Sequence, residues 1–193
     1  MTLETIYYVT QIIAVGAILA SLVAIWLQMR QSTKMARASA QRELLDRVSD
    51  FTRSFSPEAG DHFILGMSDF DNASYETKVL LHNKLMEFVF ITESALNMHN
   101  DGFFSEGTWA GIDGAMIGML RTPGGQKFWA YAKHIVGFEI ANHLSMRLED
   151  VATEGPNFLD AVPFYRPRIA TLQTADVVTS RPNETGGEDT PSV

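Results

Sequence analysis

The sequence predicts an all-α protein, in which one N-terminal transmembrane helix continues into a cytoplasmic bundle of about five to six helices and a proline-rich tail follows. An uncharged apolar run occupies the N-terminus. Farther along the chain, apolar residues recur every three or four positions, which is typical of amphipathic helices. No segment shows the period-two alternation of a half-buried strand. Together these patterns favour helices packed on helices.

The N-terminal run carries no charged side chain from Thr5 to Met29 and is bounded by Glu4 and Arg30. As a helix rising 1.5 Å per residue, its apolar core from residue 6 to residue 27 reaches about 33 Å. The hydrocarbon core of a bilayer is about 30 Å thick, so the run predicts one membrane-spanning helix. A cleaved secretory signal is the weaker alternative, because residues 1–4 contain no Lys or Arg and the run exceeds the roughly 7–15 residues of a signal peptide.

The charges that follow the run give the predicted span a direction. The four charged residues between positions 30 and 42 are all basic: Arg30, Lys34, Arg37 and Arg42. By the positive-inside rule the C-terminal side is cytoplasmic and the N-terminus lies outside. Arg30, Lys34 and Arg37 share one helix face and are expected either to contact anionic lipid headgroups or only to set the topology.

Small residues recur every four positions within the predicted span, at Gly16, Ala20 and Ala24. At this spacing they share one helix face, which lets two membrane helices approach closely. The face is interpreted either as a packing seam for a homo-oligomer or another membrane protein, or as the ordinary abundance of small residues in membrane helices.

The positions of the helix-breaking residues Gly and Pro divide the sequence into four regions. Residues 1–29 form the transmembrane helix. Residues 30–56 are a juxtamembrane extension, because no Gly or Pro interrupts residues 30–55. Its apolar face carries Leu44, Val48, Phe51 and Phe55. Residues 57–152 form the cytoplasmic helical domain. Residues 153–193 hold five of the seven prolines and are predicted to be an extended arm and a disordered tail.

Each helix of the domain has a recognisable start. Ser56 precedes Pro57 and Thr122 precedes Pro123, which is the pattern of an N-cap followed by proline at the first helical position. Ser74 and Ser105 are further N-cap candidates. The helix after Ser74 is predicted to be central, since it is the longest and carries a full apolar stripe. The helix after Ser105 contains four glycines, which suggests close packing against a neighbour or a shorter helix: Gly107, Gly111, Gly114 and Gly118.

Composition excludes several classes of function. From Glu43 onward 22 acidic residues outnumber 11 basic ones, and the whole chain has a formal net charge of −8. Such a domain would be repelled by nucleic acid, so no nucleic-acid partner is expected. The chain contains no cysteine, which excludes disulfides, thiol catalysis and thiolate metal sites.

No recognised catalytic or metal-binding pattern occurs in the sequence. Glu-x-x-His and His-Glu-x-x-His are both missing, so no metal, cofactor or catalytic residue is predicted. The turn from Thr122 to Lys127 lacks the phosphate-loop pattern and is better explained as a cap. As the alternative, a polar ligand pocket would gather His82, Glu87, His99, Thr122 and Lys127.

The uncharged helix TIYYVTQIIAVGAILASLVAIWLQMRQ and the segment GFFSEGTWAGIDGAMIGMLRTPGGQKFWA, residues 102–130, resemble a group of bacterial membrane proteins with one N-terminal span and a helical domain. The resemblance covers residues 1–150. It implies a location in the bacterial inner membrane, and it carries no activity or site residues that could be transferred.

The sequence therefore predicts a single-pass protein whose acidic domain is a non-enzymatic interaction or regulatory module. One alternative is a membrane-tethered enzyme or a ligand- or metal-binding domain. Another is an accessory subunit that contacts a larger membrane complex through its span. The lipid bilayer is the one partner that all three readings share.

Overall fold

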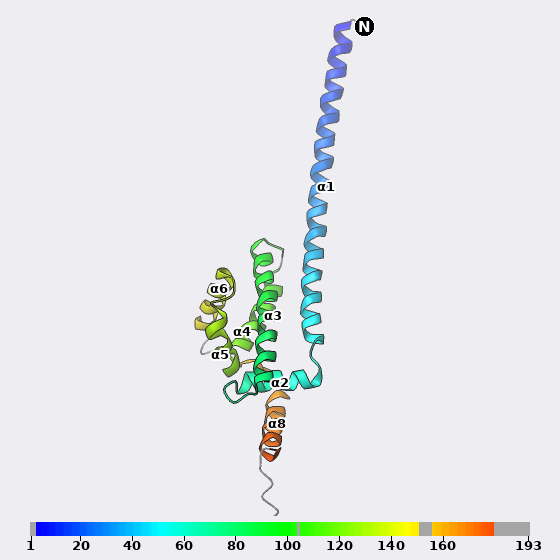
Figure 1. The fold of residues 1–193 in the computed structure, drawn as a ribbon. Coiled ribbons are helices and arrows are strands. Elements are labelled where there is room, and N and C mark those ends of the chain that lie inside the picture. The colour runs from blue at the N-terminus through cyan, green and yellow to red at the C-terminus, as the bar shows by residue number, and fades with distance from the viewer. Residues whose placement is uncertain (1–2, 104, 151–155, 180–193) are drawn as a thin grey trace, which may run out of the picture. The chain divides into compact units, whose positions relative to one another are not determined.

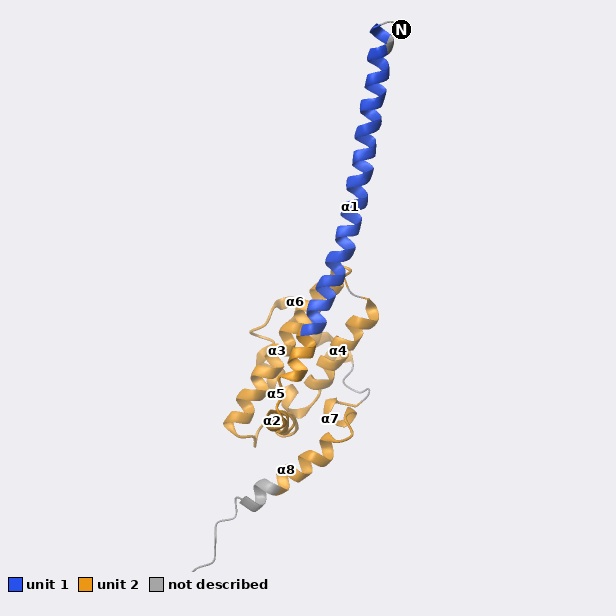
Figure 2. Ribbon diagram, turned by 90° about the vertical axis from the view of Figure 1, so that its right-hand side faces the viewer, with its two compact units in different colours: residues 1–46 blue, residues 47–193 orange. Residues whose placement is uncertain are grey.

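The computed structural model describes residues 3–103, 105–150 and 156–179 and divides the chain into two compact units, residues 1–46 and 47–193 (Figure 2). The described residues form eight helices and no strands, so the all-α prediction is confirmed. In chain order the helices are α1 (Leu3–Arg53), α2 (Pro57–Ser68), α3 (Tyr75–Asn100), α4 (Glu106–Leu120), α5 (Pro123–Ala132), α6 (Phe138–Asp150), α7 (Phe158–Ala161) and α8 (Tyr165–Thr179) (Figure 1).

The long helix α1 continues without interruption past the apolar run, as the lack of Gly and Pro predicts. It is the one described helix that is long and apolar enough to cross a membrane, judged by length and composition. None of its most apolar stretch is buried, and Ile12, for example, is 72% exposed.

Helix α3 is the centre of the second unit, as its length and apolar stripe predict. It contacts α2, α4, α5 and α6, and α2 runs across one of its ends (Figure 1). Leu81, Leu85 and Val89 of this helix are fully buried. Burying a side chain of this size contributes roughly 1.5–3 kcal/mol, so this helix holds much of the hydrophobic core.

The predicted caps are confirmed at four helix starts. The hydroxyl groups of Ser56, Ser74, Ser105 and Thr122 each accept a hydrogen bond from a backbone N–H three residues later. These bonds satisfy one of the free donors at each helix start. Gly102 follows the end of α3 with φ of 71°, a left-handed conformation that suits glycine.

The predicted role of the α4 glycines is wrong at three positions. A Cβ atom at Gly107, Gly111 or Gly114 would meet no atom within 4 Å, and α4 nevertheless runs its full length. The close approaches occur at α5 instead. A Cβ on Gly124 would overlap the backbone of α2 at Gly66, and a Cβ on Gly125 would overlap the end of α4. The Pro-Gly-Gly turn therefore sets how closely α5 packs on its neighbours.

The described part of the region 153–193 differs from the extended arm that its prolines predicted. Its described part, residues 156–179, forms the short helix α7 and the longer helix α8. Asn157 caps α7 by accepting from the N–H groups of Leu159 and Asp160. Pro167 is the third residue of α8, where no backbone N–H is needed for the helix ladder. A proline in the first turn is therefore compatible with a helix, although the number of prolines in this region had predicted an extended segment. The predicted disorder at residues 180–193 lies outside the described residues.

Candidate functional site

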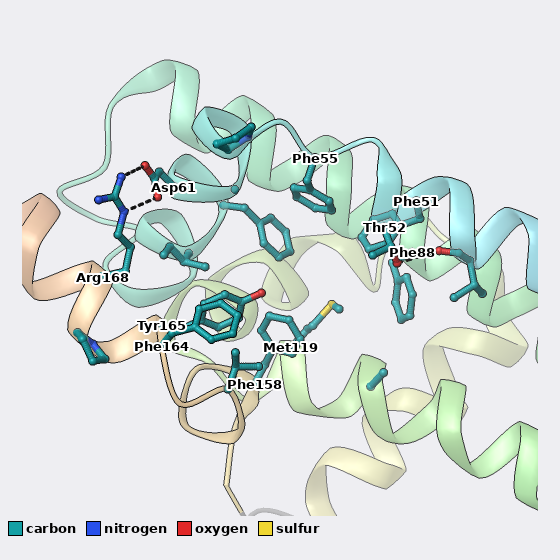
Figure 3. Close-up of a pocket in the computed structure, with 18 of the residues that line it drawn as sticks. Phe51, Thr52, Phe55, Asp61, Phe88, Met119, Phe158, Phe164, Tyr165 and Arg168 are labelled. Atoms are coloured by element: carbon teal, nitrogen blue, oxygen red, sulfur yellow. Dashed lines mark hydrogen bonds and ion pairs between the residues drawn. The ribbon is translucent and has the colours of Figure 1, made fainter.

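The second unit contains a large apolar pocket of about 1020 Å³ (Figure 3). The C-terminal end of α1, α2, α3, α4, α7 and α8 all contribute to its lining. Seven aromatic side chains supply most of the wall: Phe51, Phe55, Phe63, Phe88, Phe158, Phe164 and Tyr165. Ligand pockets in proteins are typically about 300–1,000 Å³ and mostly apolar, so this pocket is at the large end of that class.

The aromatic rings of the pocket form a connected chain. Phe51 contacts Phe88 with ring centroids 4.9 Å apart, and Phe55 contacts Phe63 at the same separation. Phe63 reaches Phe158 at 6.5 Å, which connects α2 to α7. Edge-to-face and tilted contacts at such distances are favourable for aromatic pairs. The wall is therefore held together by its own ring contacts before any ligand is present.

One ion pair stands at the edge of this apolar wall. The guanidinium group of Arg168 on α8 donates two hydrogen bonds to the carboxylate of Asp61 on α2, the first from Nε to Oδ1 at 2.9 Å (Figure 3). The hydrogen bond from Arg168 lowers the pKa of Asp61, so this carboxylate is ionised at neutral pH. These are the two charged side chains among the residues that line the pocket.

Tyr165 adds a polar group to the same region. Its ring lies 5.4 Å from that of Phe158 and 5.0 Å from that of Phe164. Burial raises the pKa of the Tyr165 hydroxyl, so it remains protonated at neutral pH and can donate a hydrogen bond.

A second cluster of polar groups lies at α4 and α6. The carboxylate of Asp113 is buried, with its side chain 5% exposed. Its Oδ1 lies 2.7 Å from Nε2 of His143, and its Oδ2 accepts from Nε of Arg147 at 3.0 Å. The ring of Trp109 lies beside His143 and stacks on His99, at centroid distances of 5.2 and 5.5 Å. Both carboxylate oxygens are therefore paired, and the cluster joins α4 to α6.

The five residues of the predicted polar pocket have separate partners. Nδ1 of His82 lies 3.0 Å from the Tyr131 hydroxyl. Glu87 pairs with Lys84 at 2.9 Å. His99 stacks on Trp109 and its Nε2 lies 3.6 Å from Glu106.

The remaining two members lie at the start of α5. Thr122 is fully buried, donates to the carbonyl of Met119 at 2.7 Å and accepts from the N–H of Gly125 at 3.0 Å. It is a helix cap, as the turn interpretation predicts. Lys127 pairs with Asp71 at 3.1 Å. No contact described in the structure joins two of the five residues, so the geometry supplies no common site for them.

The residues predicted to act at the membrane lie on α1. Gly16, Ala20 and Ala24 are exposed in the single chain. The guanidinium group of Arg30 lies over the ring of Trp26, 5.6 Å from its centroid. The packing face and the headgroup contacts stay predictions, as does the role of Lys34 and Arg37.

Sequence patterns gave no indication of the aromatic pocket or of the Asp113 cluster. Asp61 and Arg168 are 107 residues apart, and Asp113 and His143 are 30 apart. The one sequence pattern that pointed to the pocket was the spacing of Phe51 and Phe55, which are four residues apart and so share one helix face. This spacing is expected for residues of a core and for residues that line a pocket, so it does not distinguish the two. Among the described residues, no group of three or more His, Asp or Glu is placed to hold a metal ion.

No protein-family model, curated protein or solved structure matches the chain. The resemblance to bacterial membrane proteins therefore stays a prediction.

Proposed function

We propose that this chain is a single-pass protein of the bacterial inner membrane, with its N-terminus outside and a cytoplasmic helical domain that acts as a non-enzymatic binding module. The observation that carries the proposal is the aromatic pocket of about 1020 Å³. Its two charged side chains are paired with each other, which leaves a wall suited to holding an apolar group rather than to acid–base chemistry.

The membrane part of the proposal is supported by the length and composition of α1 and by the basic residues that follow its apolar run. Lys and Arg are enriched on the cytoplasmic side of membrane spans. The charge pattern thus favours a cytoplasmic location for residues 47–193, and the net negative charge of this part of the chain disfavours nucleic acid as a partner.

Topology can be tested with single cysteines, because the natural chain has none. We expect Leu3→Cys, at a position 90% exposed, to react with a membrane-impermeant maleimide in intact spheroplasts. Gly107→Cys, on an open face of α4, should react only after the membrane is permeabilised. The reverse pattern of labelling would contradict the proposed orientation, and labelling of both positions in intact spheroplasts would contradict the span.

Binding at the pocket can be tested by replacing Phe164 with the photo-crosslinking residue benzoylphenylalanine in the full chain in cells. Phe164 lines the pocket and is 67% exposed, so the change leaves the core intact. Illumination is expected to give a covalent adduct, of either lipid or protein mass. Phe138, which is 84% exposed and does not line the pocket, is the matched control position.

The adduct must also depend on the pocket itself. Gly60 lines the pocket, and a Cβ there meets no atom within 4 Å. Gly60→Leu therefore adds a bulky side chain at the lining of the pocket without a backbone clash, and we expect it to abolish the adduct. Gly114→Leu, at a helical glycine with equally open surroundings outside the pocket, should leave it unchanged. An adduct that forms equally from position 138, or that survives Gly60→Leu, would refute a binding role for this pocket.

A further inference from the structure

The size of the pocket fits one extended small molecule. A volume of about 1020 Å³ matches the upper range of ligand sites, which bury most of the surface of their ligand. A chain of ring contacts runs from Phe88 to Phe158 by way of Phe51, Phe55 and Phe63, and it gives the ligand an elongated apolar wall. A hydrocarbon chain is the simplest group that contacts such a wall along its length without needing hydrogen bonds.

The charges of the pocket select for a neutral head group. Asp61 and Arg168 neutralise each other, so a ligand with a net charge would find no unpaired counter-charge among the lining residues. Lys84 lies over the rings of Phe51 and Phe55, but it is already paired with Glu87. A hydroxyl group can both donate to the Asp61 carboxylate and accept from the Arg168 guanidinium, because these side chains are 25% and 50% exposed and remain accessible. Moving an unpaired charge to this apolar edge would cost free energy.

The chain's own C-terminal segment does not suit the pocket. Residues 180–193 contain no aromatic residue, and Glu184, Glu188 and Asp189 bring three negative charges. A segment of this composition has too little apolar surface to replace water from an aromatic wall. We therefore look for an occupant outside the chain, and a protein with the proposed membrane span is held where lipids are concentrated.

We propose that the pocket binds one neutral single-chain lipid of the monoacylglycerol class. The acyl chain lies along Phe63, Phe88 and Phe158, and the hydroxyl-bearing head group lies at the Asp61–Arg168 pair. This assignment rests on the proposed function, since it names the ligand class of the same binding module.

The test uses the full chain in phosphatidylcholine nanodiscs that contain monopalmitoylglycerol with a diazirine on its acyl chain. After illumination, peptides are mapped by mass spectrometry. We expect labelling in the pocket, at residues 158–165, in addition to the bulk lipid labelling of α1. Gly60→Leu should remove the pocket label and Gly114→Leu should keep it. Because Gly60→Leu also replaces a helical glycine, its thermal unfolding is recorded to show that the domain remains folded.

Competition with unlabelled lipids then shows whether the pocket prefers a neutral or a charged head group. Unlabelled monopalmitoylglycerol should displace the pocket label at concentrations about tenfold lower than palmitate, which carries a charge on the same chain. Equal competition by palmitate would overturn the neutral head group. Labelling confined to α1, or a pocket label that Gly60→Leu leaves in place, would overturn the lipid assignment.

The two proposals fail in different ways. If the crosslinker at position 164 captures a protein in a Gly60-dependent manner while the pocket stays unlabelled by lipid, the binding module stands and the lipid assignment falls. If neither probe gives a pocket-dependent adduct, both proposals fall.

Discussion

Replacing Gly125 with alanine is expected to destabilise the helical domain by about 3 kcal/mol, at the upper end of the cost of overpacking a core. The new Cβ would lie 2.8 Å from the Cα atom of Leu120 and would overlap the carbonyl oxygen of Met119. Both are backbone atoms, so no rotamer change can relieve the overlap. For a chain of this length the melting temperature should fall by roughly 6–12 °C, which thermal unfolding followed by circular dichroism can measure.

Gly111→Ala is the matched control for this prediction. Gly111 also lies in a helix, but a Cβ there meets no atom within 4 Å. The substitution should leave stability unchanged or raise it by up to about 1 kcal/mol, because alanine is the better helix former. Equal, small effects of the two substitutions would show that α5 does not pack as closely as the structure has it.

Replacing Asp113 with alanine is expected to cost about 2–3 kcal/mol. The buried carboxylate makes two charge-assisted hydrogen bonds, to His143 and Arg147, and bonds of this kind contribute roughly 1.5–3 kcal/mol each. The side chains of His143 and Arg147 are 24% and 42% exposed, so they regain some hydration when the carboxylate is removed. This rehydration keeps the total below the sum of two full bonds. Chemical denaturation of the full chain in detergent measures the loss.

Two further variants decide the cause of that loss. Asp113→Asn keeps the shape of the side chain but removes the charge and replaces one of the two acceptor oxygens by an NH2 donor. Its stability should therefore fall between that of the natural chain and that of the alanine variant. Asp50→Ala breaks a pair with Arg53 in which both side chains are more than 70% exposed, and it should change stability by less than about 1 kcal/mol. A loss at Asp50 that matches the loss at Asp113 would contradict a special role for the buried cluster.

The helices before residue 151 could be predicted because their starts and stops are local. A hydroxyl group at Ser74 or Thr122 caps the N–H groups of the next few residues, and the signal needs no information from elsewhere in the chain. The end of α3 is also encoded locally, by the glycine at position 102 that adopts a left-handed conformation. The apolar length of α1 is likewise a property of one continuous segment.

The missed features depend on position within an element or on distant pairing. Pro167 reads as a helix breaker in a count of prolines, yet in the first turn of α8 it breaks no hydrogen bond. The α4 glycines and the α5 glycines look alike in sequence, and only the position of the neighbouring backbone separates Gly111 from Gly125. The pocket brings together aromatic residues from five helices and from two of the segments that connect helices, and sequence alone assigns such residues to the core.

The ion pair between Asp61 and Arg168 has a consequence for the order in which the domain assembles. The two most extensive helix contacts in the second unit, α2 with α3 and α3 with α4, join neighbours along the chain, and contacts of low sequence separation form quickly. The contact of α8 with α2 bridges more than a hundred residues, so it closes only after the last helix has left the ribosome. The pocket gains its final wall at that moment. The aromatic wall supplied by α7 and α8 is therefore the last part of the pocket to form during synthesis.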